Sequence, residues 1–256
     1  MEQAVKTDPA DWPLIRKVSR LIDLDAGEIS HLASLMADTL VHPAQTEIIT
    51  AGEDFRHTTI IQEGWAAHFK LLPDGRQQIL NFSLPGDIIG LYAMVWNKAE
   101  HSVKTITDCT ISRVDPGVIL SLFTEFPRLA AIMCWSAETQ GAILREQVVR
   151  IGRRTAYERT AHLFIELLRR LEAVGLAEDN RIPFPLTQEL LADALGLTAV
   201  HINRTIRKLR NNGLIEYSKG NLAILQRDRL RQVADFDPAY LEPNALPPGT
   251  AVNSNL

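Results

Sequence analysis

The spacing of apolar residues divides the N-terminal half of the chain into two patterns. From Ile15 to Val41 the apolar positions recur at helical intervals, and Asp25 with Glu28 three residues later forms a capping-box signature. From Gln45 to Val114 short apolar or alternating runs are cut by turn residues, as in WAAHFKLL-PDG-RQQILNFSL. These patterns predict one or two short helices followed by antiparallel β-hairpins that close into a small barrel or roll.

A long helix is predicted from Phe126 to Gly152, because apolar residues recur there at intervals of three, four or seven. Small side chains and Gly141 leave part of its surface with little bulk, which favours a two-stranded coiled coil with a second copy of the chain. The heptad is irregular, so a helix packed against its own domain stays open as the alternative. A further helix is predicted from Ala156 to Val174, ended by Gly175.

Residues 185–225 have the pattern of a helix-turn-helix followed by a hairpin. Thr187 can cap a short first helix, Gly196 supplies a turn with positive φ, and Thr198 can cap a second helix from Ala199 to Asn211. The alternating segments after this helix predict a β-hairpin wing around Lys219-Gly220. Apolar residues expected to pack the two helices together are Leu190, Leu191, Ala194, Leu197, Ile202, Ile206 and Leu209.

The outer face of the second helix is predicted to be basic. Its polar side chains are His201, Asn203, Arg204, Arg207, Lys208 and Arg210. The whole chain has a net charge of −4, but residues 145–232 contain 16 Lys/Arg and 10 Asp/Glu and therefore carry +6, while the rest carries −10. Basic side chains on one helix face suit phosphates and base edges. The order of helix, glycine turn, capped helix and wing predicts a DNA-binding domain.

Composition restricts the other classes of function. No apolar run approaches the roughly 18 residues of a membrane span, and the N-terminus has no secretory pattern, so we expect a soluble chain that stays in the cytoplasm. Cys109 and Cys134 have no metal-ligand spacing, and we expect two reduced thiols, no metal site and no cofactor. The signatures HExxH, GxSxG, GxGxxG and the P-loop are absent, so an enzyme is not predicted.

The segment GLTAVHINRTIRKLRNNGLI strongly resembles the helix-turn-helix of the CRP/FNR transcription regulators, and LPGDIIGLYAM looks like that family's phosphate-binding region. The resemblance implies an α+β chain with an antiparallel β-roll of the jelly-roll type, a long dimerisation helix and a C-terminal winged helix-turn-helix. The expected division is a sensor domain at 1–125, a dimerisation helix at 126–152, a DNA-binding domain at 153–232 and a disordered tail at 233–256. It also implies a homodimer on a two-fold symmetric operator, with RNA polymerase as a further partner if the protein activates transcription.

The resemblance implies DNA-contacting roles for eight residues: Thr187, Thr198, Val200, His201, Asn203, Arg204, Arg207 and Lys208. Arg204 falls on the base-reading arginine, whose guanidinium can bind guanine through two hydrogen bonds. His201 is expected to help read a base and Asn203 to touch phosphate, while Thr187 and Thr198 are caps first and phosphate contacts second. Val200 replaces a common base-contacting glutamate, and Ala199 replaces an arginine or valine, which predicts an operator unlike the best-known ones.

The sensor domain departs from the relatives that bind cyclic AMP. The expected effector pocket comprises Gly86, Asp87, Ile89, Gly90, Leu91, His101 and Ser102. His101 stands where the resemblance implies an arginine for the phosphate, and Leu91 stands where it implies a glutamate for the ribose. A neutral histidine cannot replace the permanently charged grip of a guanidinium on phosphate, so cyclic AMP is not the predicted effector.

Other sensing modes implied by the resemblance stay open or are excluded. The FNR-type iron-sulfur cluster requires four cysteines, and this chain has two. Haem would need an axial ligand such as His57, His68 or His101. The alternatives that remain open are a regulator with an unknown small-molecule effector and a regulator without an effector. A cyclic-nucleotide-responsive regulator and a regulatory module acting by protein contact also remain open. For every alternative in which the protein binds DNA, we expect the sensor domain to set the angle of the two DNA-reading helices of the dimer through the 126–152 helix.

Overall fold

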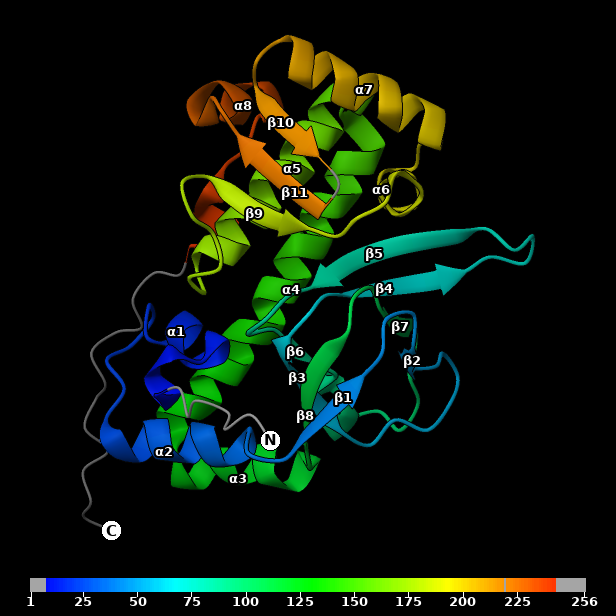
Figure 1. Ribbon diagram of the computed structural model, residues 1–256. Coiled ribbons are helices and arrows are strands. Elements are labelled where there is room, and N and C mark those ends of the chain that lie inside the picture. Colours follow the sequence, from blue (N-terminus) through cyan, green and yellow to red (C-terminus); the bar gives the residue numbers. More distant parts are fainter. Residues whose placement is uncertain (1–7, 219, 243–256) are drawn as a thin grey trace, which may run out of the picture.

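The computed structural model describes residues 8–218 and 220–242 (Figure 1). Two helices open the described chain, α1 (Pro13–Val18) and α2 (Ala26–Leu35). The predicted capping box is present, because Asp25 Oδ1 accepts a hydrogen bond from Glu28 N at 2.8 Å and Glu28 Oε2 accepts one from Asp25 N at 3.0 Å. Among the described residues, no helix is long and apolar enough to cross a membrane.

Two four-stranded antiparallel sheets form the β-roll within the described residues, in the orders β1-β8-β3-β6 and β2-β7-β4-β5. Their strands are β1 (Thr39–His42), β2 (Glu47–Ile49), β3 (Thr58–Glu63), β4 (Ala66–Leu71), β5 (Gln77–Ser83), β6 (Ile88–Ile89), β7 (Ser102–Thr105) and β8 (Cys109–Val114). The predicted helix up to Val41 is wrong at its end. Thr39 to Val41 belong to β1, which gains its backbone hydrogen bonds by pairing with β8 in register Val41–Thr110.

The pattern did not predict a short helix, α3 (Pro116–Glu125). Asp115 is its N-cap, and the Asp115 carboxylate accepts a hydrogen bond from Gly117 N. α3 leads into α4 (Pro127–Arg153), so the predicted long helix is confirmed within one residue at each end. In Figure 1, α4 runs from the lower, sensor part of the molecule to the upper part that contains α5 to α8. This helix therefore connects the β-roll to the predicted DNA-binding domain.

The C-terminal part contains the predicted helix-turn-helix and its wing. Its elements are α5 (Ala156–Glu172), β9 (Arg181–Phe184), α6 (Gln188–Leu195), α7 (Ala199–Asn211), β10 (Ile215–Ser218), β11 (Gly220–Ile224) and α8 (Arg227–Ala234). β10 and β11 form the predicted hairpin, while Lys219 of its expected turn lies outside the described residues. β9 joins this hairpin as a third strand, a pairing that local pattern did not reveal.

The predicted disorder of 233–256 is wrong for residues 233–242. These form the end of α8 and a short 3-10 helix, η3 (Pro238–Tyr240). Phe236 is 5% exposed with its ring centroid 5.0 Å from that of His162, and the Tyr240 hydroxyl donates to Glu166 Oε2 at 2.7 Å. Two aromatic side chains thus fix a segment that was expected to be part of a disordered tail. Residues 243–256 lie outside the described part of the chain.

One hydrophobic cluster contains residues from both halves of the chain. Trp65 beside β4 meets Phe184 of β9 edge to face, with ring centroids 6.2 Å apart. At the same boundary, the side-chain amides of Gln77 and Gln78 on β5 donate to the Asp193 carboxylate and backbone oxygen at 2.7 and 2.9 Å. The β4-β5 hairpin therefore contacts α6 directly, in addition to the connection through α4.

Candidate nucleic-acid interface and sensor cavity

The helix-turn-helix is built by the three residues that the sequence indicated. The Thr187 hydroxyl accepts a hydrogen bond from Leu190 N, and the Thr198 hydroxyl accepts one from His201 N, each at 3.2 Å. Gly196 ends α6 in the left-handed conformation at φ 63°, which glycine adopts without steric strain. The threonine hydroxyls are therefore engaged as helix caps, while both residues remain exposed at the surface.

One face of α7 packs into the domain and the other faces solvent. Its buried residues are Ile202, Thr205, Ile206 and Leu209. The remaining predicted packing residues, on α6 and in the turn, are Leu191 and Ala194, which are buried, and Leu190 and Leu197, which are partly buried against the same core. The exposed residues are Val200, His201, Asn203, Arg204, Arg207, Lys208 and Arg210. All predicted DNA-contacting residues thus lie at the surface, and the helix is held by an apolar face opposite them.

Positive charge on α7 is not neutralised within the described residues, where none of Arg204, Arg207, Lys208 and Arg210 has an ion pair. Several basic residues elsewhere in the same half have an ion pair: Arg150 with Glu166, Arg154 with Glu146, Arg170 with Asp87 and Arg227 with Glu172. Four basic side chains without an ion pair to a described residue therefore lie together on α7, where a phosphate backbone can be bound.

Helical spacing sorts the exposed residues of α7 into a central row and two flanks. Val200, Arg204 and Arg207, spaced by four and three, form the row opposite the buried face. Lys208 lies on one flank, where its Nζ is 4.7 Å from the centroid of the Tyr157 ring. Asn203 lies on the other flank and donates through Nδ2 to Gln188 Oε1 at 3.2 Å.

Two residues of this surface were missed in the sequence. Gln188 fixes the amide of Asn203, and Tyr157 of α5 holds the ammonium of Lys208. Both contacts join different helices, and no local pattern indicates them. Arg204 has no such partner among the described residues, so its guanidinium is free to bind a ligand.

A cavity of about 250 Å³, here called the roll cavity, lies between the β-roll and α4. Four of the predicted effector residues line it, namely Ile89, Gly90, Leu91 and His101. The α4 residues Ala137, Gln140 and Leu144 close it from the other side. The structure therefore brings part of the predicted pocket against the helix that was expected to mediate dimerisation.

The polar groups of the roll cavity form a chain of hydrogen bonds. His68 Nδ1 and His101 Nε2 are 2.8 Å apart, and His68 Nε2 is 2.7 Å from the Ser83 hydroxyl. Burial, together with the neighbouring His101, lowers the pKa of His68 to about 3, and burial lowers the pKa of His101. Both rings are therefore neutral near pH 7. His101 Nδ1 and the Tyr92 hydroxyl, both buried, have no hydrogen-bond partner among the described residues.

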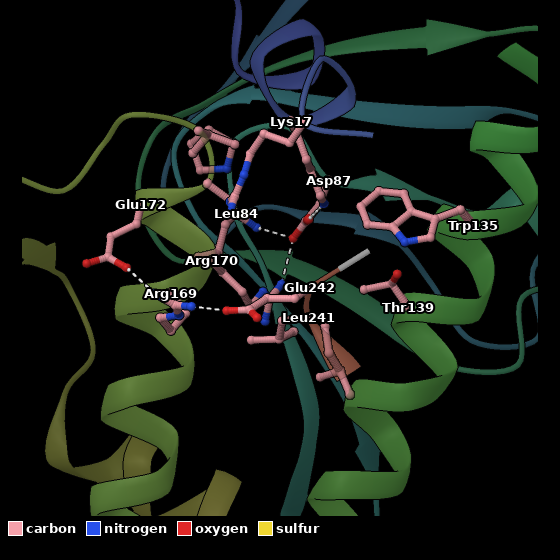
Figure 2. A pocket seen from close by; sticks show the side chains of 15 residues that line it. Lys17, Leu84, Asp87, Trp135, Thr139, Arg169, Arg170, Glu172, Leu241 and Glu242 are labelled. Carbon is pink, nitrogen blue, oxygen red and sulfur yellow. Dashed lines mark hydrogen bonds and ion pairs between the residues drawn. The ribbon is translucent and has the colours of Figure 1, made fainter. Parts of the chain in front are cut away.

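The remaining predicted effector residues lie away from the roll cavity. Ser102 Oγ accepts a hydrogen bond from Ala51 N at 3.0 Å. Gly86 does not line the cavity. It has a φ of 84° in a turn whose backbone lies close to the Pro13 backbone. Asp87 instead borders a smaller cavity of about 110 Å³, shown in Figure 2, between α1, α4 and α5. The structure therefore does not group these three residues with the four that line the roll cavity.

Asp87 is held by two cations (Figure 2). Its carboxylate accepts from Lys17 Nζ at 2.6 Å, from Arg170 Nη2 at 2.7 Å and from Leu84 N at 2.9 Å. Burial raises the pKa of Asp87, but the two positive charges and these hydrogen bonds outweigh burial and lower it to about 2. The ion pairs join α1 and α5 to the β-roll, so Asp87 acts in domain packing.

The residues of the roll cavity do not fit a cyclic nucleotide. Its phosphodiester is an anion, and none of the described lining residues is Lys or Arg. The two histidines are neutral, and the carboxylate of Glu100 borders the cavity. None of the three histidines considered as an axial haem ligand is suitably placed. His68 and His101 are hydrogen-bonded to each other, and His57 is exposed.

A second polar cluster, at the junction of α4 and α5, was not indicated by the sequence. Buried Arg150 pairs with buried Glu166 and donates to Gln147 Oε1 at 2.5 Å. Gln147 in turn donates through Nε2 to the Ala194 backbone oxygen of α6 at 2.5 Å. Because Tyr240 also donates to Glu166, this junction cluster links α4, α5, α6 and the C-terminal segment.

Comparisons with known proteins agree with this architecture. Residues 39–126 match the family model of the cyclic nucleotide-binding domain, and residues 158–233 match that of the Crp-like helix-turn-helix domain. The structure is similar to that of FixK2 from Bradyrhizobium japonicum, with a TM-score of 0.69 at 24% identity over 77% of this chain and 96% of that one. A CooA variant from Carboxydothermus hydrogenoformans gives a TM-score of 0.64 at 15% identity over 91% and 98%.

Sequence relatives are transcription regulators. The chain is 31% identical to the nitrogen fixation regulation protein FixK of Bradyrhizobium diazoefficiens over 222 residues, which are 86% of this chain and 91% of that protein. It is also 31% identical to the transcriptional activatory protein AadR of Rhodopseudomonas palustris, over 67% of this chain and 71% of that protein. With a cyclic-nucleotide-binding-like β-roll, a long connecting helix and a winged helix-turn-helix, the chain belongs to the CRP/FNR family of DNA-binding transcription regulators.

Proposed function

We propose that the protein works as a homodimer that binds a two-fold symmetric operator, with one α7 in the major groove of each half-site. The observation that carries this proposal is the solvent-facing row Val200, Arg204 and Arg207 on a helix whose basic residues have no ion pair among the described residues. Arg204 binds a guanine through two hydrogen bonds, while Arg207 and Lys208 bind phosphates. The half-sites of such a dimer are centred about one helical turn apart.

A seam on α4 supports the dimer. Cys134, Ala137, Gly141, Leu144 and Val148 are spaced by three, four, three and four residues, which is the repeat of a two-stranded coiled coil. Leu144 and Val148 are 46% and 61% exposed, although both are large apolar residues. A second copy of α4 would cover this seam. The small residues at its N-terminal end would let the two helices approach closely.

The roll cavity is the proposed effector site, because α4 borders both this cavity and the proposed dimer seam. Its lining favours an uncharged molecule that can hydrogen-bond to His101 or Tyr92. A ligand there can change the packing of α4 and, through the β5 contact with α6, the orientation of α7. We place the protein in the cytoplasm with the chromosome, and RNA polymerase is a further partner if the operator position permits activation.

The test has two parts. The purified chain is first incubated with a randomised DNA pool, with and without cyclic AMP, and the bound fraction is sequenced. We expect a two-fold symmetric site without cyclic AMP. In parallel, sedimentation of the protein should give a dimer, and Leu144→Glu should shift it to monomer. No enrichment in either condition would contradict DNA reading and favour a module acting by protein contact, whereas enrichment only with cyclic AMP would contradict the effector assignment.

A further inference from the structure

We propose that Val200 recognises the 5-methyl group of a thymine in each half-site, within about two base pairs of the guanine bound by Arg204. This inference rests on the proposed function, because it requires α7 to lie in the major groove. It adds a specificity-determining residue that has no charge and no hydrogen-bonding group.

Exposure singles out Val200. It is 71% exposed, more than any other large apolar side chain among the described residues of the C-terminal domain, where Leu225 and Leu176 follow at 48% and 41%. The other aliphatic residues of α7, Ile202, Ile206 and Leu209, are buried. A β-branched apolar residue also contributes little to helix propensity or solubility at such a position. Val200 is therefore an apolar contact that the folded monomer leaves open.

Geometry places Val200 where bases are read. It lies in the first turn of α7, two residues after the capping Thr198, and the N-terminal residues of a recognition helix contact base edges. Arg204 follows four residues later on the same face, which corresponds to about 6 Å along the helix axis. Base pairs are about 3.4 Å apart along the duplex, so the two side chains reach neighbouring base pairs.

The chemistry of the major groove then selects thymine. Each base edge presents hydrogen-bond donors or acceptors, and the C5-methyl group of thymine is the apolar feature of this groove. Val200 offers no partner to a donor or acceptor, so packing it on such a group would desolvate that group without a hydrogen bond. Packing on the methyl group buries apolar surface on both sides. Glutamate at this position would instead accept a hydrogen bond from cytosine N4.

The experiment removes the methyl group from the DNA. Starting from the operator selected with the wild-type chain, each thymine is replaced in turn by deoxyuridine, and dissociation constants are measured by fluorescence anisotropy. For one thymine in each half-site, we expect the replacement to weaken binding about fourfold, the effect of burying one methyl-sized group. This loss should be smaller in Val200→Ala, which lacks both γ-methyl groups and reaches less far from the helix, and should persist in Val200→Thr, which keeps one γ-methyl group. Leu225→Ala, at the next most exposed large apolar side chain of the described C-terminal domain, is the control and should leave the deoxyuridine effect unchanged.

The outcomes separate this inference from the function on which it rests. If no DNA sequence is enriched, the proposed function fails. If a symmetric operator is enriched and Arg204→Ala abolishes its selection, but no deoxyuridine substitution has an effect that depends on Val200, the proposed function stands and the role of Val200 is refuted. A Val200-dependent loss at a thymine next to the Arg204 guanine supports both.

Discussion

The junction cluster predicts a large loss of stability when one member of its ion pair is removed. Arg150 on α4 and Glu166 on α5 have side chains that are only 3% and 1% exposed. Replacing Arg150 by Met leaves the Glu166 carboxylate buried, with the Tyr240 hydroxyl as its nearest partner and Arg170 at 3.9 Å. An uncompensated buried charge of this kind costs about 3–5 kcal/mol.

A double-mutant cycle separates the ion pair from simple packing. Glu166→Leu alone should also cost about 3–5 kcal/mol, because it leaves the guanidinium unpaired. The double variant Arg150→Met/Glu166→Leu removes both charges and should be more stable than either single variant, with a remaining loss of about 1–3 kcal/mol from the unpaired polar neighbours. The two residues should therefore show a strong coupling energy.

The unfolding free energies of the wild type and the three variants are measured by urea denaturation at pH 7 and a fixed protein concentration. Arg145→Met is the matched control on the same helix, because Arg145 and its partner Glu138 are 64% and 74% exposed. It should change the free energy of unfolding by less than about 0.5 kcal/mol. Equal small losses for Arg150→Met and Arg145→Met, or a double variant whose loss is the sum of the two single losses, would refute this reasoning.

Three further predictions concern other parts of the molecule. Burial and the charges of Arg150 and Arg154 lower the pKa of His162 to about 2, so the unfolded state binds a proton that the folded state does not as pH falls below 6.5. Between pH 7 and 5, the wild type should therefore lose about 2 kcal/mol more unfolding free energy than His162→Phe in urea titrations. Parallel pH profiles for the two proteins would contradict this prediction. Phe236→Ala should cost about 3 kcal/mol by the same denaturation assay, because the side chain is buried; a neutral Phe236→Ala would show that this segment is not part of the core. Gly90→Ala should destabilise the β-roll, since the added Cβ would lie 2.2 Å from the Phe55 ring at a φ of 79°, and an unchanged melting temperature would count against the described turn.

The helix-turn-helix was predictable because its information is local. Two capping threonines and a glycine with positive φ set the ends of the helices, and the apolar period within each helix identifies the buried face. The same period leaves Val200 and Arg204 on the outer face. For this reason the exposed basic face of α7 was predictable from local pattern, whereas the DNA-contacting roles of individual residues came from the family resemblance.

What the sequence did not reveal depends on contacts between distant residues. β9 is recognisable as a strand only through its pairing with β11. The order of the segment around Phe236 is likewise recognisable only from the packing of Phe236 on His162. The hydrogen bond between His68 and His101 joins residues 33 positions apart. A resemblance can suggest that His101 faces an effector, but the pairing that keeps it neutral follows from the folded β-roll.

Asp87 shows how a motif can mislead about a side chain. It lies between Gly86 and the cavity-lining Ile89, yet its carboxylate is bound by Lys17 and Arg170 on the other side of the turn. One element can therefore serve two cavities. Only three-dimensional geometry assigns each residue to one of them.

If α7 reads DNA sequence through Arg204, removing this side chain should abolish sequence preference and spare nonspecific attraction to DNA. Binding of wild type and Arg204→Ala to the selected operator and to random DNA is measured by fluorescence anisotropy over a range of salt concentrations. We expect Arg204→Ala to lose about 1–3 kcal/mol of discrimination per half-site, while its salt-dependent binding to random DNA stays close to that of the wild type. Equal weakening on both DNAs, or undiminished preference for the operator, would contradict the account.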